Sequence, residues 1–389
     1  MLVGEAIDRK IRPLGLVVEQ PGHRGLPLAT LSSVPACFAL LALYTLVFVL
    51  HLIVPGRWVT GYVNDEHTGV RLRYRLNGLR VMAIMVALYL LAGATGLVAW
   101  DYVYVHRWDN LATACVIGLA FTAAVVLPAP ARRGLLADLY LGRRENPQLL
   151  GGHVDAKMFL YLIGAVMLEL NLLGFAAHHV LLYPSDPSPG VLLHVGLFSF
   201  FLCEYLFFEE VHLYTYDFFA ERLGFKLGWG CLTFYAFFYA VGLWSLADAP
   251  NPHTPTPLLV ACALLFFTGW VLARGANMQK FYFKSDPSHR AFGRIAPEAL
   301  EHGGHRLLVN GFWGLSRHIN YLGEITMATA LALSLGYPGA PGPWLYPLYY
   351  LMLLVPRQHF DDIRCAAKYG DLWTAYTRRV PYRIIPGVY

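Results

Sequence analysis

Long apolar segments separated by short polar stretches run along most of this chain. A transmembrane helix needs about 20 predominantly apolar residues, and nine segments approach or reach that length. They are Leu31–Val54, Leu79–Trp100, Leu111–Leu127, Met158–Leu182, Val191–Phe208, Leu227–Leu246, Leu258–Leu272, Trp313–Leu335 and Trp344–Val355. The pattern predicts an all-α, polytopic helical membrane protein with a single membrane domain over residues 1–389.

Basic residues are concentrated in alternate loops. Lys and Arg crowd the loops after the first, third and seventh apolar segments and the stretch after the last, whereas Tyr183–Gly190 and Asp248–Pro257 contain neither. The positive-inside rule then predicts that the basic loops and the C-terminus are cytoplasmic. The basic N-terminal arm (Lys10, Arg12 and Arg24) belongs on the same side only if the number of crossings is even, so we expect about ten transmembrane helices.

Composition narrows the class of protein further. The chain is 57% apolar and only 14% charged, against about 25% charged residues in a soluble domain. The net charge of +5 is explained by the basic loops, so no nucleic-acid partner is expected. The six cysteines form no C-x-x-C pair, which favours buried reduced thiols over a metal site. We expect an integral multi-pass protein of a bacterial inner membrane or of the endoplasmic reticulum, in contact with membrane lipid.

The first polar cluster is the block RGANMQKFYFK (Arg274–Lys284). Lys280 and Lys284 are four residues apart, so both ammonium groups leave the same face of a helix. Such a pair can bind anionic lipid at the membrane surface. It can equally bind the phosphates of a nucleotide.

The second cluster lies in GFWGLSRHINYLGE, where Trp313, Arg317, His318, Asn320 and Tyr321 fall within one short segment. Aromatic residues at a membrane interface are common. An Arg-His pair and an Asn entering an apolar segment are not explained in this way, because buried polar groups need partners. A bound cofactor would supply them.

The third cluster begins with Arg357 and Asp361, which are spaced i and i+4 on a predicted helix. This spacing is compatible with a structural ion pair and with part of a polar site. Cys365, Lys368, Tyr369, Trp373 and Tyr376 follow. The final VPYRIIPGVY is predicted to fold back on the helices as a cap.

Polar side chains also occur within or beside the apolar segments, among them Glu169, Glu204, Glu209, Glu210 and Tyr239. An ionisable group in a membrane span is a functional-site hypothesis by default, although a neutral hydrogen-bonded core residue is an equal alternative for Glu169. The chain has no glycine-rich dinucleotide motif, Walker motif or HExxH, so a nucleotide would not be bound through a Rossmann fold.

These blocks resemble the sterol reductases of the Δ14, Δ7 and Δ24(28) group, which includes the reductase domain of the lamin B receptor. The similarity extends from LRYRLNGL (Leu72–Leu79) to Tyr389 and includes GRRENPQ, DAKMF, NMQKFYFK, GFWGLSRHINYLGE and RCAAKYGDLWTAYTRRVPYRIIPGVY. It implies a ten-helix membrane enzyme that saturates a sterol double bond with NADPH. It also implies a substrate half in residues 1–260 and a C-terminal cytoplasmic cofactor half in residues 261–389.

The resemblance assigns roles to individual residues. The cofactor positions are Lys280, Lys284, Leu308, Trp313, Arg317, Asn320, Tyr321, Arg357, Asp361, Cys365, Ala366, Ala367, Lys368, Tyr369 and Tyr376. Tyr239 corresponds to a tyrosine that faces the substrate cavity. We expect Tyr239, or else Glu209 or Glu210, to relay a proton, and Asp361, held by Arg357, to orient the cofactor or a water molecule. The sterol is expected to enter from the bilayer.

The sequence departs from the family pattern in three places. Tyr161-Leu162-Ile163-Gly164-Ala165 replaces a Glu-x-Arg-Pro-Gly motif, Cys231 replaces an Asp, and Glu324 replaces an Asp after Gly323. The segments GFWG, LGWG and YTRRVPYRIIPG are more similar to 7-dehydrocholesterol reductases, whereas FFEEVHLYTYD is more similar to Δ14 reductases. On balance these motifs favour the Δ7 bond over the Δ14 bond.

Two other functions remain open from sequence. Isoprenylcysteine carboxyl methyltransferases share an Arg-His/Asn-Tyr-x-Gly segment and a C-terminal Tyr-Gly…Tyr…Val-Pro pattern, and use S-adenosylmethionine, but they are shorter and lack the NMQKFYFK block. A non-catalytic sterol-binding or scaffold protein on the same fold is the second alternative, because the substrate half is altered.

Overall fold

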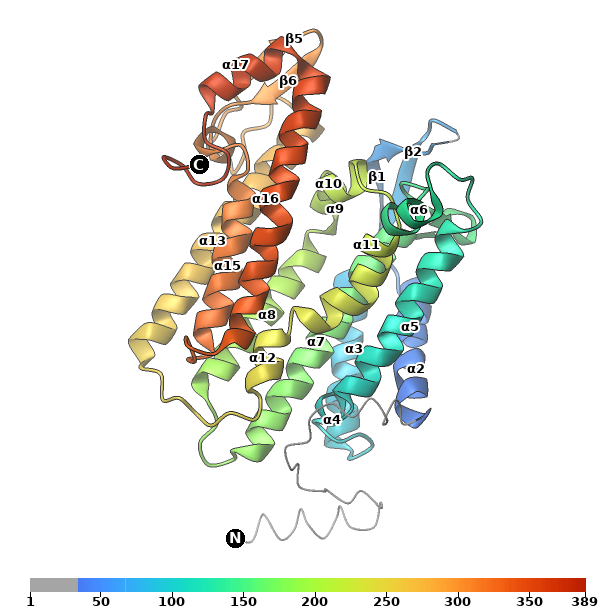
Figure 1. Ribbon diagram of the computed structural model, residues 1–389, viewed down its shortest axis with the longest axis vertical. Coiled ribbons are helices and arrows are strands. Elements are labelled where there is room, and N and C mark those ends of the chain that lie inside the picture. Colours follow the sequence, from blue (N-terminus) through green and yellow to red (C-terminus); the bar gives the residue numbers. More distant parts are fainter. Residues whose placement is uncertain (1–33, 67) are drawn as a thin grey trace.

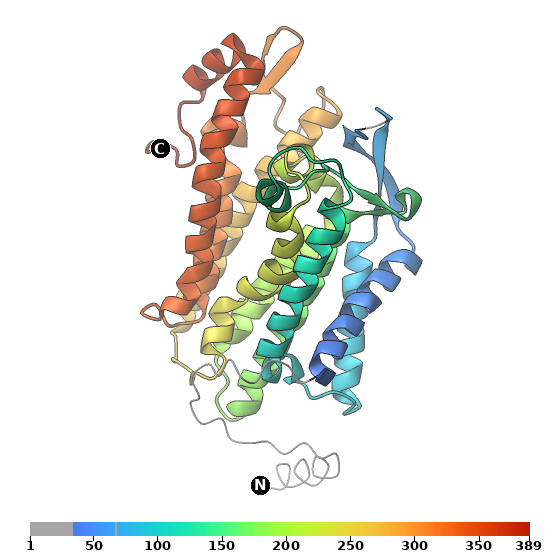
Figure 2. The same ribbon diagram turned by 45° about the vertical axis from the view of Figure 1, so that its right-hand side comes forward.

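The computed structural model describes residues 34–66 and 68–389. The predictions that concern Lys10, Arg12, Arg24 and the start of the first apolar segment lie outside the described residues. The long helices run roughly side by side, and the hairpins and short helices gather mainly at their two ends (Figures 1 and 2).

Helix α7 (Ala156–Leu182) is the centre of the first half of the fold and is buried along almost its whole length. Its predominantly apolar sequence, interrupted by Glu169 and Asn171, allows helices to pack on every side. At its start the Asp155 carboxylate accepts a hydrogen bond of 2.9 Å from the Met158 N–H, which satisfies one of the free donors of the first turn. The other helices before residue 250 are α2 (Val34–Ile53), α3 (Gly78–Ala94), α4 (Tyr102–Val105), α5 (Arg107–Val126), α6 (Leu135–Leu141), α8 (Pro189–Phe207), α9 (Glu209–His212), α10 (Tyr216–Phe219), α11 (Phe225–Trp229) and α12 (Val241–Leu246).

The second half is built on three helices that pack together, α13 (Thr256–Ser285), α15 (Ile319–Ser334) and α16 (Pro341–Tyr369). Helices α13 and α15 cross at two glycines, Gly269 and Gly323. A Cβ atom added at Gly269 would lie 2.7 Å from the Gly323 carbonyl oxygen, and one at Gly323 would lie 2.5 Å from the Ala273 nitrogen. Only glycine permits this backbone contact. Two short helices, α14 (Phe312–Leu315) and α17 (Asp371–Arg379), complete this half.

Three short antiparallel hairpins, which the apolar pattern did not predict, lie outside the bundle. Strands β1 (Arg57–Asn64) and β2 (Arg71–Leu76) pair with Arg57 opposite Leu76. Strands β5 (Ala299–His302) and β6 (His305–Leu308) pair with Ala299 opposite Leu308, and β3 (Gln148–Leu149) and β4 (Val154–Asp155), joined by η2 (Leu150–Gly152), form the smallest ladder. Figure 1 shows β1, β2, β5 and β6 at the end of the molecule that carries the C-terminus.

The predicted apolar segments correspond to helices, but the later boundaries differ. Helix α13 continues through the polar block to Ser285, α15 begins only at Ile319, and the short ninth segment is the middle of the 29-residue α16. Of the described helices, six are long and apolar enough to cross a membrane. The protein is therefore a mostly helical membrane protein, and the predicted count of about ten crossings is not confirmed.

The sixth of these candidate spans, Phe225–Leu246, is not a regular α-helix. Its middle, η3 (Gly230–Phe238), is a π-helix, and Tyr239 follows it directly. Extended π-helical segments are rare and occur most often at functional sites. The widened turns of η3 end at Tyr239, beside a cavity described below.

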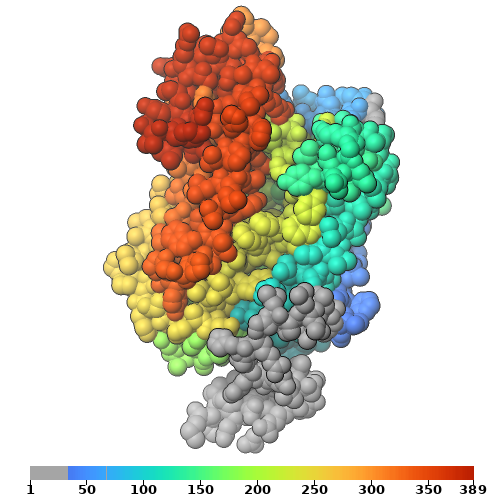
Figure 3. All heavy atoms as spheres, in the orientation of Figure 1, coloured from blue at the N-terminus to red at the C-terminus, as the bar shows by residue number. Residues whose placement is uncertain are grey.

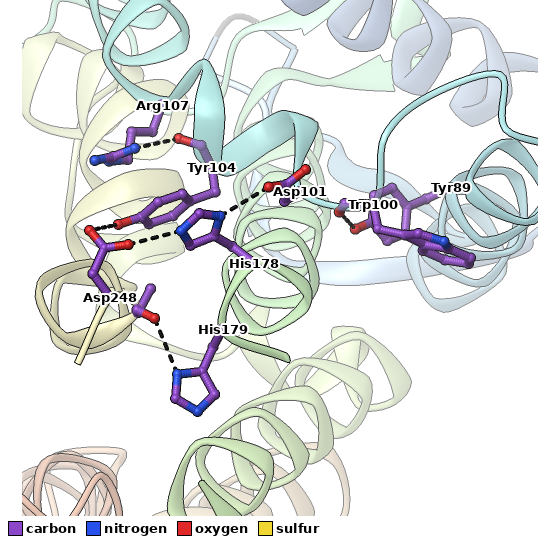
Figure 4. A network of polar contacts seen from close by, with 9 residues as sticks. Tyr89, Trp100, Asp101, Tyr104, Arg107, His178, His179 and Asp248 are labelled. Carbon is purple, nitrogen blue, oxygen red and sulfur yellow. Dashed lines mark hydrogen bonds and ion pairs between the residues drawn. The ribbon is translucent and has the colours of Figure 1, made fainter. Parts of the chain in front are cut away.

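A polar cluster joins three elements at the opposite end of the bundle (Figure 4). The ring of His178 lies between two carboxylates, with Nδ1 2.9 Å from Asp101 and Nε2 2.8 Å from Asp248. Tyr104 stacks on this ring at 3.9 Å between centroids and donates a hydrogen bond of 2.9 Å to Asp248. The cluster ties α4, the end of α7 and the segment after α12 together.

Candidate functional site

A cavity of about 620 Å³ opens between the two halves, at the end of the bundle that carries the C-terminus. In the space-filling view, the red C-terminal segment and the blue-green segment around α6 stand apart there (Figure 3). The volume is within the usual range for small-molecule sites. Cationic and aromatic side chains line its mouth, and tyrosines line its interior.

Lys280 and Lys284 both line the mouth, as their spacing on one helical face predicted. The Lys280 Nζ lies 5.5 Å from the ring centre of Trp313, and the Lys284 Nζ lies 4.2 Å from that of Tyr62. Neither ammonium forms an ion pair with a carboxylate of the described residues. The mouth therefore holds two positive charges that are available to an anion.

The segment between α14 and α15 contributes several polar side chains to the wall. Ser316, Arg317 and His318 are buried, and burial, with the charges of Lys280 and Arg317, lowers the pKa of His318 to about 3. Its ring is therefore neutral. The His318 Nε2, the Arg317 Nε and the Asn320 Oδ1 are buried without a hydrogen-bond partner in the described structure. Unpaired buried donors and acceptors of this kind are typical of a site that binds a polar ligand.

The C-terminal segment holds this wall in place, which confirms the predicted cap. The backbone N–H groups of Arg317 and His318 donate to the carbonyl oxygens of Tyr382 and Arg383 at 2.9 and 2.8 Å. The Ser316 hydroxyl donates to the Ile384 carbonyl at 2.9 Å. The polar ending of the chain is thus part of the site.

The predicted partner of Arg357 is wrong. The Arg357 Nη2 lies 2.9 Å from Asp217, in α10, and 3.5 Å from Glu221, which follows α10. Both carboxylates lie across the cavity from α16. Burial alone would raise the pKa of Asp217, but the charges of Arg357 and of two lysines hold it below its ordinary value. Arg357 therefore bridges the two halves. Asp361 lies on the same wall as Arg357 and forms no direct ion pair within the described structure. Burial raises the pKa of Asp361, against the opposing charges of Lys280, Arg364 and Arg357.

The remaining cofactor candidates fall into two groups. Those that line the cavity are Leu308, Trp313, Arg317, Asn320, Tyr321, Cys365, Lys368, Tyr369 and Tyr376. Ala366 and Ala367 do not, because they are exposed on the outer face of α16. On a helix, positions 361, 365, 368 and 369 share one face, which turns the two alanines away from the cavity. Their assignment as cofactor residues stays a prediction.

Four tyrosines line the interior of the cavity, Tyr235, Tyr239, Tyr349 and Tyr350. Tyr346 does not line it but packs against Tyr239 and Tyr350, and these five residues together form a tyrosine cluster. The ring of Tyr239 is at the centre of this tyrosine cluster, 4.8 Å from Tyr235 and 4.7 Å from Tyr346 between centroids. Two departures from the family pattern, Tyr161 and Cys231, line the same cavity. These two departures from the family pattern are therefore changes in the wall of the cavity.

Glu209 and Glu210 do not line the cavity. Glu209 is buried and accepts a hydrogen bond of 3.1 Å from the Gly78 N–H at the start of α3, and Glu210 pairs with Arg57. We therefore assign neither residue a role in proton transfer.

The environment of Glu209 leads to a prediction about stability. Burial raises the pKa of Glu209 to about 7, against the opposing hydrogen bond from Gly78. A carboxyl group that titrates higher in the folded state destabilises the fold as pH rises through that window. Glu209→Gln is expected to raise the apparent melting temperature above about pH 7 and to change it little near pH 5. Thermal unfolding of both proteins across this range measures the difference, with Glu210→Gln as the control. Equal stabilisation at both ends of the range would contradict the assignment.

Several residues of the site were not identified from sequence. Asp217 and Glu221 are acidic residues between two apolar segments, and nothing in their spacing indicates the cavity. Arg274 is the first residue of the predicted block Arg274–Lys284, but its pairing with Glu204 could not be predicted from sequence. Glu204 and Glu324 can be recognised from sequence as candidate site residues, because both are carboxylates in or beside an apolar segment.

The fold and this cavity define a class: a multi-pass helical membrane protein with a ligand cavity that opens at one end of its bundle. Residues 18–389 match the model of the Ergosterol biosynthesis ERG4/ERG24 family. The chain belongs to this family of sterol reductases and is thus an oxidoreductase of the type that acts on CH–CH groups.

Curated relatives share most of the chain. It is 31% identical over 374 residues to a Delta(14)-sterol reductase of Arabidopsis thaliana, with 92% of this chain and 97% of the relative covered. It is 32% identical over 354 residues to a Delta(14)-sterol reductase of Methylotuvimicrobium alcaliphilum, with 87% and 80% covered. It is 34% identical over 335 residues to the Delta(14)-sterol reductase TM7SF2 of Mus musculus, with 82% and 78% covered.

Proposed function

We propose that this protein reduces the Δ14 carbon–carbon double bond of a sterol, with NADPH as the reductant. The observation that carries the proposal is the pairing of two environments in one cavity. Two unpaired ammonium groups stand at its mouth, and a tyrosine-lined chamber lies beneath them. The relatives are named as Delta(14)-sterol reductases, which supports reduction of the Δ14 bond. The sequence motifs alone favoured the Δ7 bond.

The residues at the mouth fit a dinucleotide. Lys280 and Lys284 can bind phosphate groups, including the extra phosphate that distinguishes NADPH from NADH. Trp313 and Tyr321 offer ring faces for stacking, and the unpartnered His318 Nε2 and Asn320 Oδ1 can hydrogen-bond amide or hydroxyl groups. When bound, this cofactor supplies the hydride.

The protein must supply the proton for the other alkene carbon. Tyr239 is our candidate for the donor, because a phenol can donate a proton while remaining neutral in an apolar chamber. We further propose that the sterol enters this chamber from the bilayer and that the cofactor end of the molecule, with the C-terminus, faces the cytoplasm.

The proposal is tested by incubating the purified protein with Δ14, Δ7 and Δ24(28) sterols and NADPH, followed by mass spectrometry of the products. A mass gain of two hydrogens in the Δ14 sterol alone is the expected result. Reduction of the Δ7 sterol instead would reassign the bond. Binding of sterol with no reduction of any of the three would identify a non-catalytic sterol-binding protein. Membership of the ERG4/ERG24 family argues against the methyltransferase alternative.

A double substitution tests the cofactor. Lys280→Ala with Lys284→Ala is expected to raise the apparent KM for NADPH by about 10-fold or more, since each charge-assisted contact to a phosphate contributes about 1.5–3 kcal/mol. Sterol binding should change little. Arg290→Ala with Arg294→Ala is the matched control, because it removes two exposed positive charges from the next loop, outside the cavity. Equal use of NADH and NADPH by the wild-type protein would contradict this assignment.

A further inference from the structure

One carboxyl group between the mouth of the cavity and the tyrosine cluster forms no ion pair of its own within the described structure. Glu324, on α15, lines the cavity beside the pair formed by Arg274 and Glu204. Arg274 binds Glu204 through both Nε and Nη2, with 2.7 Å between Nη2 and Oε2. Both members of this pair are buried.

The balance of charge indicates which carboxyl carries a proton. Arg274 and Glu204 neutralise each other, so one guanidinium serves two carboxyl groups. An ionised Glu324 would add an uncompensated negative charge next to Glu204, which is unfavourable away from water. Glu324 therefore holds its proton at rest. The Arg274 Nη1 has no hydrogen-bond partner in the described structure, so one donor is free to offset a negative charge that forms on Glu324.

Close polar contacts lead from Glu324 into the tyrosine cluster. The Tyr350 hydroxyl lies within reach of the Glu324 carboxyl and interacts with it. The Tyr346 hydroxyl donates to the Tyr350 hydroxyl at 3.3 Å. The ring of Tyr346 packs against that of Tyr239. A carboxylic acid thus stands at one end of a row of phenols, and the proposed proton donor stands at the other.

We propose that Glu324 is the proton source of the tyrosine cluster, an inference that rests on the proposed function. The Tyr239 O–H bond breaks as its proton forms the new C–H bond on one alkene carbon, and the reduced nicotinamide dinucleotide supplies the hydride to the other. The phenolate of Tyr239 takes a proton from the cluster, and the Glu324 O–H bond breaks to restore the Tyr350 phenol. Water from the open mouth then protonates the Glu324 carboxylate.

The substitution Glu324→Gln tests this pathway. Glutamine keeps the shape of the side chain but has no acidic proton to transfer. Glu324→Gln is expected to lower kcat by about 10-fold or more, since general acid catalysis contributes about 10² to 10⁴-fold. The KM values for sterol and cofactor should stay near wild type. Glu324→Asp should restore most of the rate. Glu169→Gln is the matched control, because Glu169 is a buried carboxyl that Ser199 hydrogen-bonds at 2.8 Å, outside the cavity.

The pH profile separates proton supply from a structural role. The wild-type kcat should fall as pH rises and Glu324 loses its proton, and the Gln variant should lack this decline. Groups that face Glu324 and influence the profile are Arg274 on α13, Glu204 on α8, Tyr235 on η3, and Tyr346 and Tyr350 on α16. Tyr350→Phe should reproduce the loss, and adding Glu324→Gln to it should cost little more, because both residues lie on one pathway.

Infrared spectroscopy provides a readout that does not depend on turnover. The wild-type protein at neutral pH should show the carbonyl stretch of a protonated carboxylic acid that Glu324→Gln removes and that Glu169→Gln leaves in place. Absence of this band overturns the inference even if no sterol is reduced. A Gln variant that reduces sterol at the wild-type rate also overturns it. Failure of the wild-type protein to reduce any sterol, with the band present, overturns the proposed function and leaves a protonated Glu324.

Discussion

Replacing Tyr239 by Phe is expected to lower kcat by about 10²-fold or more, the usual scale for a lost general acid. The substitution removes one hydroxyl from the centre of the tyrosine cluster and leaves its ring packing on Tyr235 and Tyr346 in place. NADPH affinity should stay near wild type, because the phosphate-binding lysines lie at the mouth of the cavity. Single-turnover measurement of sterol reduction at saturating NADPH gives the rate of the chemical step.

Tyr44→Phe is the matched control for this variant. The Tyr44 hydroxyl is also buried and donates to the Leu232 carbonyl of η3 at 2.6 Å, but it does not line the cavity. Its loss should leave the rate per folded molecule near wild type. If Tyr239→Phe reduces sterol at close to the normal rate, another phenol of the cluster or Asp361 is the donor.

Replacing Arg357 by Ala is expected to remove most of the activity and to destabilise the fold as well. Sequence alone suggested a pair with Asp361, whereas the structure pairs Arg357 with Asp217 and Glu221 on the far side of the cavity. Removing one partner of a buried ion pair costs about 3–5 kcal/mol. The apparent melting temperature should therefore fall by roughly 5 °C or more, and thermal unfolding in detergent measures the fall.

Two further variants separate the roles of this wall. Arg379→Ala breaks an exposed pair with Glu298 and should change stability by less than about 1 kcal/mol. Asp361→Asn should reduce turnover with the fold intact, because Asp361 makes no direct ion pair within the described structure. An Arg357→Ala protein of normal stability would show that the bridge across the cavity contributes nothing to folding.

Much of the site follows from local sequence. Lys280 and Lys284 share a helical face whatever the tertiary fold, and the polar run Arg317–Tyr321 cannot be explained by lipid contact. Both inferences depend only on helix geometry and on the cost of burying polar groups. Helices and their approximate positions follow in the same way from the length of the apolar segments.

The rest depends on contacts between distant parts of the chain. Arg357 and Asp217 are 140 residues apart, and an i, i+4 neighbour was the natural partner to expect from sequence. Hydropathy identified only the middle of α16, because the polar residues of its C-terminal part line a cavity. The π-helical turns of η3 arise where the bulky sequence Trp229–Tyr239 packs against α5 and α7, and no periodicity in the sequence indicates them.

Because α13 and α15 touch backbone to backbone at Gly269 and Gly323, Lys280 on one helix and Tyr321 on the other are held at a fixed separation before any ligand arrives. A preformed frame loses little conformational freedom when it binds, which favours affinity. Any side chain at either glycine would force the two helices apart and spread the groups that meet the cofactor. A natural variant at Gly269 or Gly323 should therefore be interpreted as a defect in cofactor affinity, although neither glycine lines the cavity.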